Sequence, residues 1–168
     1  CNFLQLFTAV NAMAERYDMP ILYSCHPRSR KRLEATGFRL DSRVIAHEPL
    51  GFHDYNCLQM NAFAVVSDSG TLPEESSFFL SIGKPFPAIS IRTSTERPEA
   101  LDAGCFVLAG IDTESLLQGV EMAVQMQQEG CFGTPVADYT GENVSMKAAR
   151  LIQSYTGVVN KMVWRKGR

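Results

Sequence analysis

Residues 63–75 read Phe-Ala-Val-Val-Ser-Asp-Ser-Gly-Thr-Leu-Pro-Glu-Glu, an apolar run followed by a small polar turn and a pair of carboxylates. The apolar run at 63–66 predicts a buried strand. The residues Thr-Leu-Pro-Glu at 71–74 match a capping box, with proline in the first helical turn. This stretch therefore predicts a strand, a tight turn and a helix, which together form the repeating unit of an α/β protein.

Strand and helix signals alternate in the same way through the rest of the chain. Apolar runs predict strands at 21–23, 44–46, 63–66, 87–91 and 105–109. Helical patterns are found at 2–17, 29–36, 54–61, 72–82, 112–128, 142–155 and 158–164. The alternation predicts a Rossmann-like parallel sheet with helices on both faces. Ligands of such sheets bind beyond the carboxyl ends of the strands, which here places the candidate loops at 25–28, 48–55, 68–75 and 92–99.

Composition narrows the function classes. The 168 residues carry a formal charge of −2, so we expect neither a nucleic-acid nor a membrane partner, and no run reaches the ~20 apolar residues of a membrane span. Five cysteines without a CxxC motif are typical of reduced thiols in a cytoplasmic protein. His47 and His53 have no partner at metal-ligand spacing, so we expect no metal site. Because the chain starts inside a helical pattern at Cys1, we expect a piece of a longer protein.

The turn at 69–71 is the strongest local candidate for a ligand site. Backbone N–H groups of Ser69, Gly70 and Thr71 precede a helix, where free donors and the helix dipole favour a phosphate. Glu74 and Glu75 lie about 100° apart on that helix. If Glu74 closes the cap, Glu75 is left to accept hydrogen bonds from a polyol such as ribose. An ordinary capped helix, with both glutamates stabilising its dipole, is the alternative reading.

Three further groups have two readings each. Residues 92–99 combine two arginines with three hydroxyl residues, which suits a phosphorylated ligand or a solvated loop with internal ion pairs. Tyr55 could stack on a planar ring or be a half-buried core residue. His26 could contact a ligand or cap the following helix.

A set of short motifs in a fixed order identifies a family resemblance. Asp-Ser-Gly at 68–70 is followed by Glu-Glu at 74–75, Gly-Lys-Pro at 83–85, Thr-Glu-Arg-Pro-Glu at 95–99 and Asp-Ala-Gly at 102–104. His-Pro-Arg at 26–28, Glu-Pro-Leu-Gly at 48–51 and Val-Leu-Ala-Gly at 107–110 support it. Together they resemble, over nearly the whole chain, the C-terminal half of the non-hydrolysing UDP-N-acetylglucosamine 2-epimerases. Residues 74–77 and 154–164 are most similar to the branch that makes UDP-N-acetyl-L-fucosamine.

The resemblance implies a domain arrangement. Residues 1–155 would be the UDP-binding C-terminal domain of a GT-B architecture, and residues 156–168 a helical tail that crosses back over the N-terminal half. That half, with the catalytic acid/base groups, would precede Cys1, together with a strand that is central in the sheet. The substrate and the N-terminal domain would be the partners, and a homodimer of the full-length protein is allowed.

The resemblance also implies an activity and a set of site residues. Ser69, Gly70 and Thr71 would hold the diphosphate, Glu75 the ribose hydroxyls and Tyr55 the uracil. Arg97 would reach toward the diphosphate or the sugar. The reaction would invert C2 of a UDP-N-acetylhexosamine (UDP-GlcNAc/UDP-ManNAc or a 6-deoxy-L-sugar analogue) through elimination of UDP to an unsaturated glycal and re-addition. It needs no cofactor and would serve polysaccharide biosynthesis.

The sequence departs from the family pattern at two positions near the turn. Thr71 stands where the family usually has a second glycine, and Pro73 where it usually has glutamine. A β-branched residue resists positive φ, so we expect the turn to differ in detail.

Two other functions remain open beside the epimerase interpretation. They are the C-terminal domain of a GT-B glycosyltransferase and a non-catalytic UDP-binding module.

Overall fold

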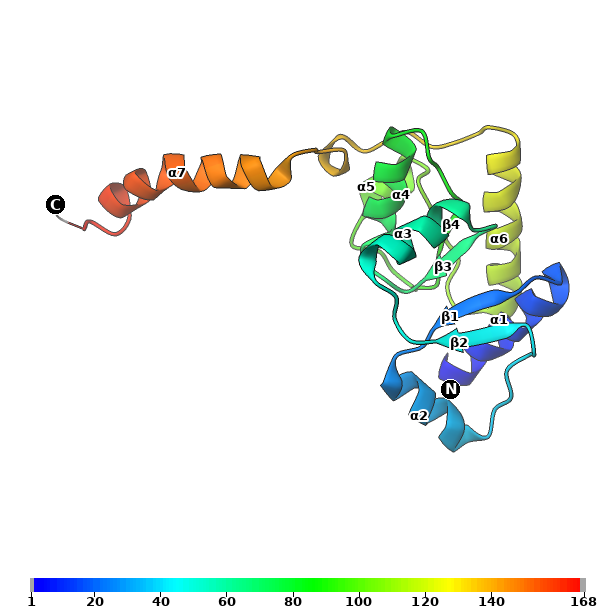
Figure 1. The fold of residues 1–168 in the computed structure, drawn as a ribbon. Helices are drawn as coiled ribbons and strands as arrows, with labels where there is room; N and C mark the ends of the chain where they lie inside the picture. The colour runs from blue at the N-terminus through cyan, green and yellow to red at the C-terminus, as the bar shows by residue number, and fades with distance from the viewer. Residues whose placement is uncertain (1, 167–168) are drawn as a thin grey trace.

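The computed structural model describes residues 2–166, so Cys1 and the last two residues of the predicted tail lie outside the described residues. Its strands are β1 (Ile21–Ser24), β2 (Val44–His47), β3 (Val65–Ser67), β4 (Ala88–Ser90) and β5 (Val107–Leu108). Its helices are α1 (Asn2–Tyr17), α2 (Pro27–Thr36), α3 (Phe52–Asn61), α4 (Leu72–Ser81), α5 (Pro98–Asp102), α6 (Thr113–Gln128) and α7 (Val144–Met162), with a 3₁₀ turn η1 (Ala137–Tyr139). Figure 1 shows their arrangement.

The strands are all parallel, as the alternation of elements predicts. Among the described residues they form two sheets, β1-β2 and β3-β4-β5. β1 pairs with β2, where Ile21 aligns with Val44, and β3 pairs with β4, where Val65 aligns with Ala88. β1 and β3 do not pair with each other. The gap between β1 and β3 lies where the family resemblance implies a further central strand that precedes Cys1.

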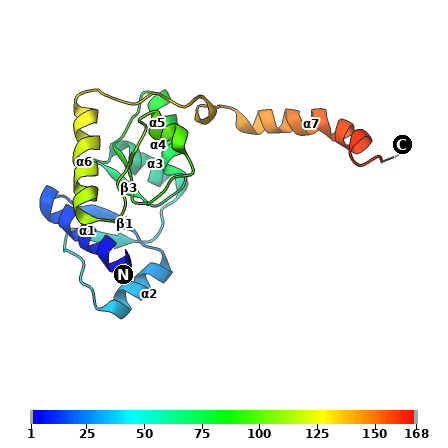
Figure 2. The same ribbon diagram turned by 180° about the vertical axis from the view of Figure 1, so that it is seen from behind.

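One apolar cluster joins the two sheets on one face. Ala9 and Met13 of α1 pack with Leu116 and Val120 of α6 and with Ile89 of β4. Side chains of β1, β3 and β5 pack against the same cluster, so α1 covers part of both sheets. Figures 1 and 2 show α1 and α6 side by side.

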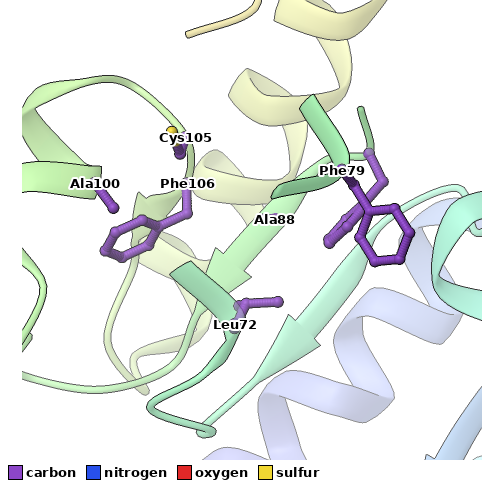
Figure 3. Packing of buried hydrophobic residues seen from close by; sticks show 7 residues of the cluster. Leu72, Phe79, Ala88, Ala100, Cys105 and Phe106 are labelled. Atoms are coloured by element: carbon purple, nitrogen blue, oxygen red, sulfur yellow. The ribbon is translucent and has the colours of Figure 1, made fainter. Parts of the chain in front are cut away.

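A second apolar cluster covers the opposite face of the three-stranded sheet. Leu72 and Phe79 of α4 meet Ala100 of α5 and Phe106, which precedes β5. In Figure 3 these side chains lie in front of the strands, with α6 behind them. Helices on both faces of a parallel sheet confirm the fold class. Because Leu72 is fully buried, the start of α4 is fixed against the sheet.

Two helices differ from the sequence expectation. α5 begins at Pro98, inside the 92–99 segment that we expected to be a loop, and it is too short for a hydrophobic period to reveal it. α7 is continuous where two helices were expected, because the chain stays helical through Gly157. In Figures 1 and 2, α7 extends away from the rest of the chain. Its apolar side chains are exposed, Ile152 at 69% and Met162 at 70%.

The segment between α6 and α7 is tied to α4 and to the turn after α5. Thr134 N–H donates to the carbonyl of Ala103 at 2.8 Å, and Val136 N–H donates to the Ser77 hydroxyl at 2.8 Å. Gly133 makes the closest approach, since a Cβ there would clash with the carbonyl oxygen of Ala103 and lie 2.5 Å from the carbonyl carbon of Gly104. The segment therefore depends on a glycine at this position.

Replacing that glycine tests this contact. We expect Gly133→Ala to lower the free energy of unfolding by about 1–3 kcal/mol, because backbone atoms must shift to admit the methyl group. Gly157→Ala is the matched control, since a Cβ there meets nothing within 4 Å and alanine favours a helix. Urea denaturation of both variants measures the difference. Equal stability of Gly133→Ala and the unaltered chain would contradict the close packing.

Candidate functional site

The candidate site lies where β3 and β4 end. Their parallel register aligns Ser67 with Ser90, so the loops that follow both strands open at the same edge. Gly70 in the first loop faces Arg92 in the second, since a Cβ on Gly70 would lie 3.2 Å from the Arg92 Nη1. The structure thus confirms that the 68–75 and 92–99 segments meet.

The turn before α4 is held by its own hydroxyl groups. Ser69 N–H donates to the Ser67 hydroxyl at 3.0 Å, and Thr71 N–H donates to the Ser69 hydroxyl at 3.2 Å. Thr71 has φ −89°, in the right-handed region, so the expected conflict between a β-branched residue and positive φ does not arise. The first helical bond is from Glu75 N–H to Thr71 O, which leaves the N–H groups of Leu72 and Glu74 without a partner inside the helix.

The capping box predicted for residues 71–74 is not formed. Thr71 makes no side-chain cap bond, and Glu74 instead accepts from Arg97 Nε at 2.6 Å. A charge-assisted pair is stronger than a neutral cap bond, which explains the choice of partner. Glu74 also raises the pKa of Arg97 through this hydrogen bond.

Glu75 is held from two sides. Its Oε2 accepts from Gln59 Nε2 of α3 at 2.7 Å, and its Oε1 accepts from the Thr71 hydroxyl at 2.8 Å. Tyr55 lies within electrostatic range: burial, and then the charge of Glu75, raise the pKa of the half-buried Tyr55 phenol. Glu75 also lines an open cavity of about 490 Å³, with Phe52 of α3 on its wall.

Of the six predicted residues, the structure joins Ser69, Thr71 and Glu75 through hydroxyl hydrogen bonds, with Gly70 in the same turn. Tyr55 is within electrostatic range of Glu75. Arg97 lies at the first turn of α4, with its guanidinium bonded to Glu74 and to the Glu96 carbonyl. Arg92 is the guanidinium beside the turn, and its Nη2 pairs with Glu96 Oε1 at 3.0 Å.

Sequence reasoning missed Gln59. It lies one helical turn after Tyr55, and this i, i+4 spacing toward a predicted site residue was the available signal. His26 fulfils the capping alternative, because its Nδ1 accepts from Arg28 N–H at 3.2 Å at the start of α2.

Two features are not found in the part of the chain that the structure describes. Between residues 2 and 166, no three His, Cys, Asp or Glu side chains gather in a way that could hold a metal ion. Over the same residues, no helix has the length and apolar content needed to span a bilayer.

Comparison with known proteins connects this arrangement to one family. Residues 2–153 match the family described as UDP-N-acetylglucosamine 2-epimerase. The chain belongs to this family. A UDP-N-acetylglucosamine 2-epimerase of Methanococcus maripaludis is 35% identical over 138 residues, which cover 80% of this chain and 36% of the relative.

Solved structures agree with the family and with the fold class. A UDP-N-acetylglucosamine 2-epimerase from Rickettsia bellii superposes with a TM-score of 0.83 and 34% identity, covering 98% of this chain and 44% of that one. The Methanocaldococcus jannaschii UDP-GlcNAc 2-epimerase in complex with UDP-GlcNAc and UDP gives a TM-score of 0.74 at 27% identity, over 92% and 41% of the two chains. This chain therefore spans less than half the length of these relatives.

The proximity of Tyr55 to Glu75 can be measured by titration. We expect Glu75→Gln to lower the pKa of the Tyr55 phenol, but not to its ordinary value, because burial is the larger cause of the shift. NMR of ¹³Cζ-labelled tyrosine follows each phenol separately. Glu121→Gln is the matched control, since Glu121 raises the pKa of Tyr17 instead. If the pKa of the Tyr55 phenol is the same in Glu75→Gln and in the unaltered chain, the Glu75 charge does not act on Tyr55 and the expected proximity is contradicted.

Proposed function

We propose that this chain is the UDP-binding domain of a nucleotide-sugar 2-epimerase that inverts C2 of a UDP-N-acetylhexosamine. The observation that carries the proposal is the carboxylate of Glu75, fixed by Gln59 and Thr71 beside the helix start at Ser69–Thr71. The half-buried Tyr55 lies within electrostatic range of that carboxylate. A diphosphate, a ribose and a uracil are adjacent parts of one ligand, and these three groups provide a matching partner for each. Membership of the epimerase family supports the same assignment.

Each site residue has a role in this proposal. The N–H groups at the start of α4 bind the diphosphate, because they are free donors at the positive end of the helix dipole. Glu75 accepts hydrogen bonds from the ribose hydroxyls, and Tyr55 lies against the uracil. Arg92 is the nearer cation to the turn, and Arg97 reaches the ligand after releasing Glu74. Both ion pairs are partly exposed, with side chains 32–68% accessible, so exchanging a glutamate for a phosphate costs little.

The proposed reaction uses the diphosphate as a leaving group. The C2 proton is removed while the bond between C1 and the UDP oxygen breaks, which leaves a double bond between C1 and C2. Return of a proton to the opposite face of C2, and re-addition of UDP at C1, complete the inversion. This domain stabilises the charge on the departing UDP and holds it for re-addition. The groups that move the proton lie in the remainder of the protein.

Features at two other places support a longer protein with a second half. β1 and β3 each leave one edge unpaired in the described sheets, which suits a further central strand between them. α7 carries an exposed apolar face and no acidic residue from Val144 to Met162, and in our proposal it crosses to cover the second half. The L-fucosamine branch is the proposed sugar specificity, on the resemblance of residues 154–164.

Binding of UDP tests the domain's role directly. We expect the 168-residue chain to bind UDP in isothermal titration, and Glu75→Ala to weaken binding by about tenfold or more, since a hydrogen bond to a charged group is lost. Glu114→Ala is the control: it removes a carboxylate from the first turn of a different helix, α6, and should keep full affinity for UDP. Unaltered UDP binding by Glu75→Ala would contradict the ribose role.

Isotope exchange tests the reaction. In deuterated water, the full-length protein should interconvert UDP-N-acetylhexosamine epimers without an acceptor sugar, and NMR should find deuterium at C2. The isolated 168-residue chain should give no turnover, because it holds UDP but not the proton-transfer groups. Transfer to an added acceptor without C2 exchange would favour a glycosyltransferase, and turnover by the isolated chain would overturn the division of roles.

A further inference from the structure

Gln59 is a buried polar side chain whose role the proposed binding site leaves unassigned. Its relative exposure is 2%, in a helix whose neighbouring residues Leu58 and Met60 are exposed. The Nε2 donates to Glu75 Oε2 at 2.7 Å, while the Oε1 is buried and has no partner among the described residues. An unpaired buried amide oxygen is unfavourable, so a purely structural position would be better filled by an apolar residue.

The proton count around Glu75 shows what Gln59 supplies. The Thr71 hydroxyl has one proton, and it is donated to Glu75 Oε1. The 2.9 Å contact between the Ser69 and Thr71 hydroxyls is therefore a donation from Ser69. Each oxygen of Glu75 thus receives one donor, Thr71 on one side and Gln59 on the other.

This arrangement leaves room for a diol on the same carboxylate. A carboxylate has about four acceptor sites, two on each oxygen, so one site on each Glu75 oxygen stays open. The 2′- and 3′-hydroxyls of a ribose are adjacent donors and can each take one of these sites. Thr71 is exposed at the turn, whereas Gln59 is enclosed, so Gln59 is the less mobile of the two anchors.

We propose that Gln59 is a positioning residue that fixes the plane of the Glu75 carboxylate for both ribose hydroxyls. The inference rests on the proposed UDP-binding function and adds a specificity determinant to it. Without the amide donor, the carboxylate rotates about its terminal bond and cannot meet the two hydroxyls together. Gln59 therefore sets the preference for ribose over 2′-deoxyribose, and it leaves the diphosphate contacts unchanged.

The preference between UDP and 2′-deoxy-UDP separates this role from a general structural one. We expect the 168-residue chain to bind UDP about tenfold more tightly than 2′-deoxy-UDP. In Gln59→Met, which keeps the length and volume of the side chain, the ratio should fall to about twofold, with 2′-deoxy-UDP affinity nearly unchanged. Gln127→Met is the matched control, because Gln127 Oε1 is also buried and unpartnered but lies on α6.

The outcomes distinguish the inference from the function on which it rests. A tenfold preference retained in Gln59→Met, or equal losses for both nucleotides, overturns the positioning role and leaves UDP binding intact. A chain that shows no preference, or no UDP binding, overturns the ribose role of Glu75 and this inference with it. If Gln59→Met does not fold, Gln59→Asn keeps the amide but withdraws it by one methylene, and it should lose the same preference.

Discussion

The parallel pairing of β3 with β4 is the constraint on which the candidate site depends. Because Ser67 and Ser90 are in register, the two chains leave the sheet at one edge and their loops share one small volume. Burial of Leu72 and Phe79 then fixes α4 against the sheet, which directs its N-terminus to the same edge. The backbone donors and the Glu75 carboxylate are thus positioned by the apolar core, and their own hydrogen bonds adjust only the final orientation.

Charge at this edge is balanced by pairs that can be exchanged. Arg92 pairs with Glu96 and Arg97 with Glu74, in both cases with partly accessible side chains. Ion pairs that are accessible to water contribute little to stability, so an incoming phosphate dianion can replace each glutamate at small cost. It would then bind both guanidinium groups. Glu75 differs because its partners are neutral donors, Gln59 and Thr71, which leave its charge available to hydroxyl groups.

Much of the fold around the candidate site could be predicted from the sequence, because hydrophobic periodicity and local motifs determine these elements. The strand–turn–helix at 65–81 and the meeting of the 68–75 and 92–99 loops follow from strand order and motif spacing. The grouping of Tyr55 with Glu75 is implied by the family resemblance and not by the local pattern. The partner of Glu74 could not be predicted, because a capping box and an ion pair to Arg97 compete, and only the fold brings residue 97 within 2.6 Å. The gap between β1 and β3 agrees with the missing central strand that the family resemblance implies, whereas no single strand of this chain reveals it by its own residues.

Gln59 shows why a site is harder to read than a fold. Its donor reaches from α3 to a residue of α4 that is 16 positions away, and helix α3 has no clear apolar face that would reveal a buried glutamine. An amide with one satisfied and one unsatisfied end is a poor contribution to folding but a good way to fix a carboxylate. The unfavourable burial of the Gln59 amide is therefore best explained by the Glu75 carboxylate that it holds. The sequence motifs, the helix dipole and the family resemblance place the ligand at the same carboxylate.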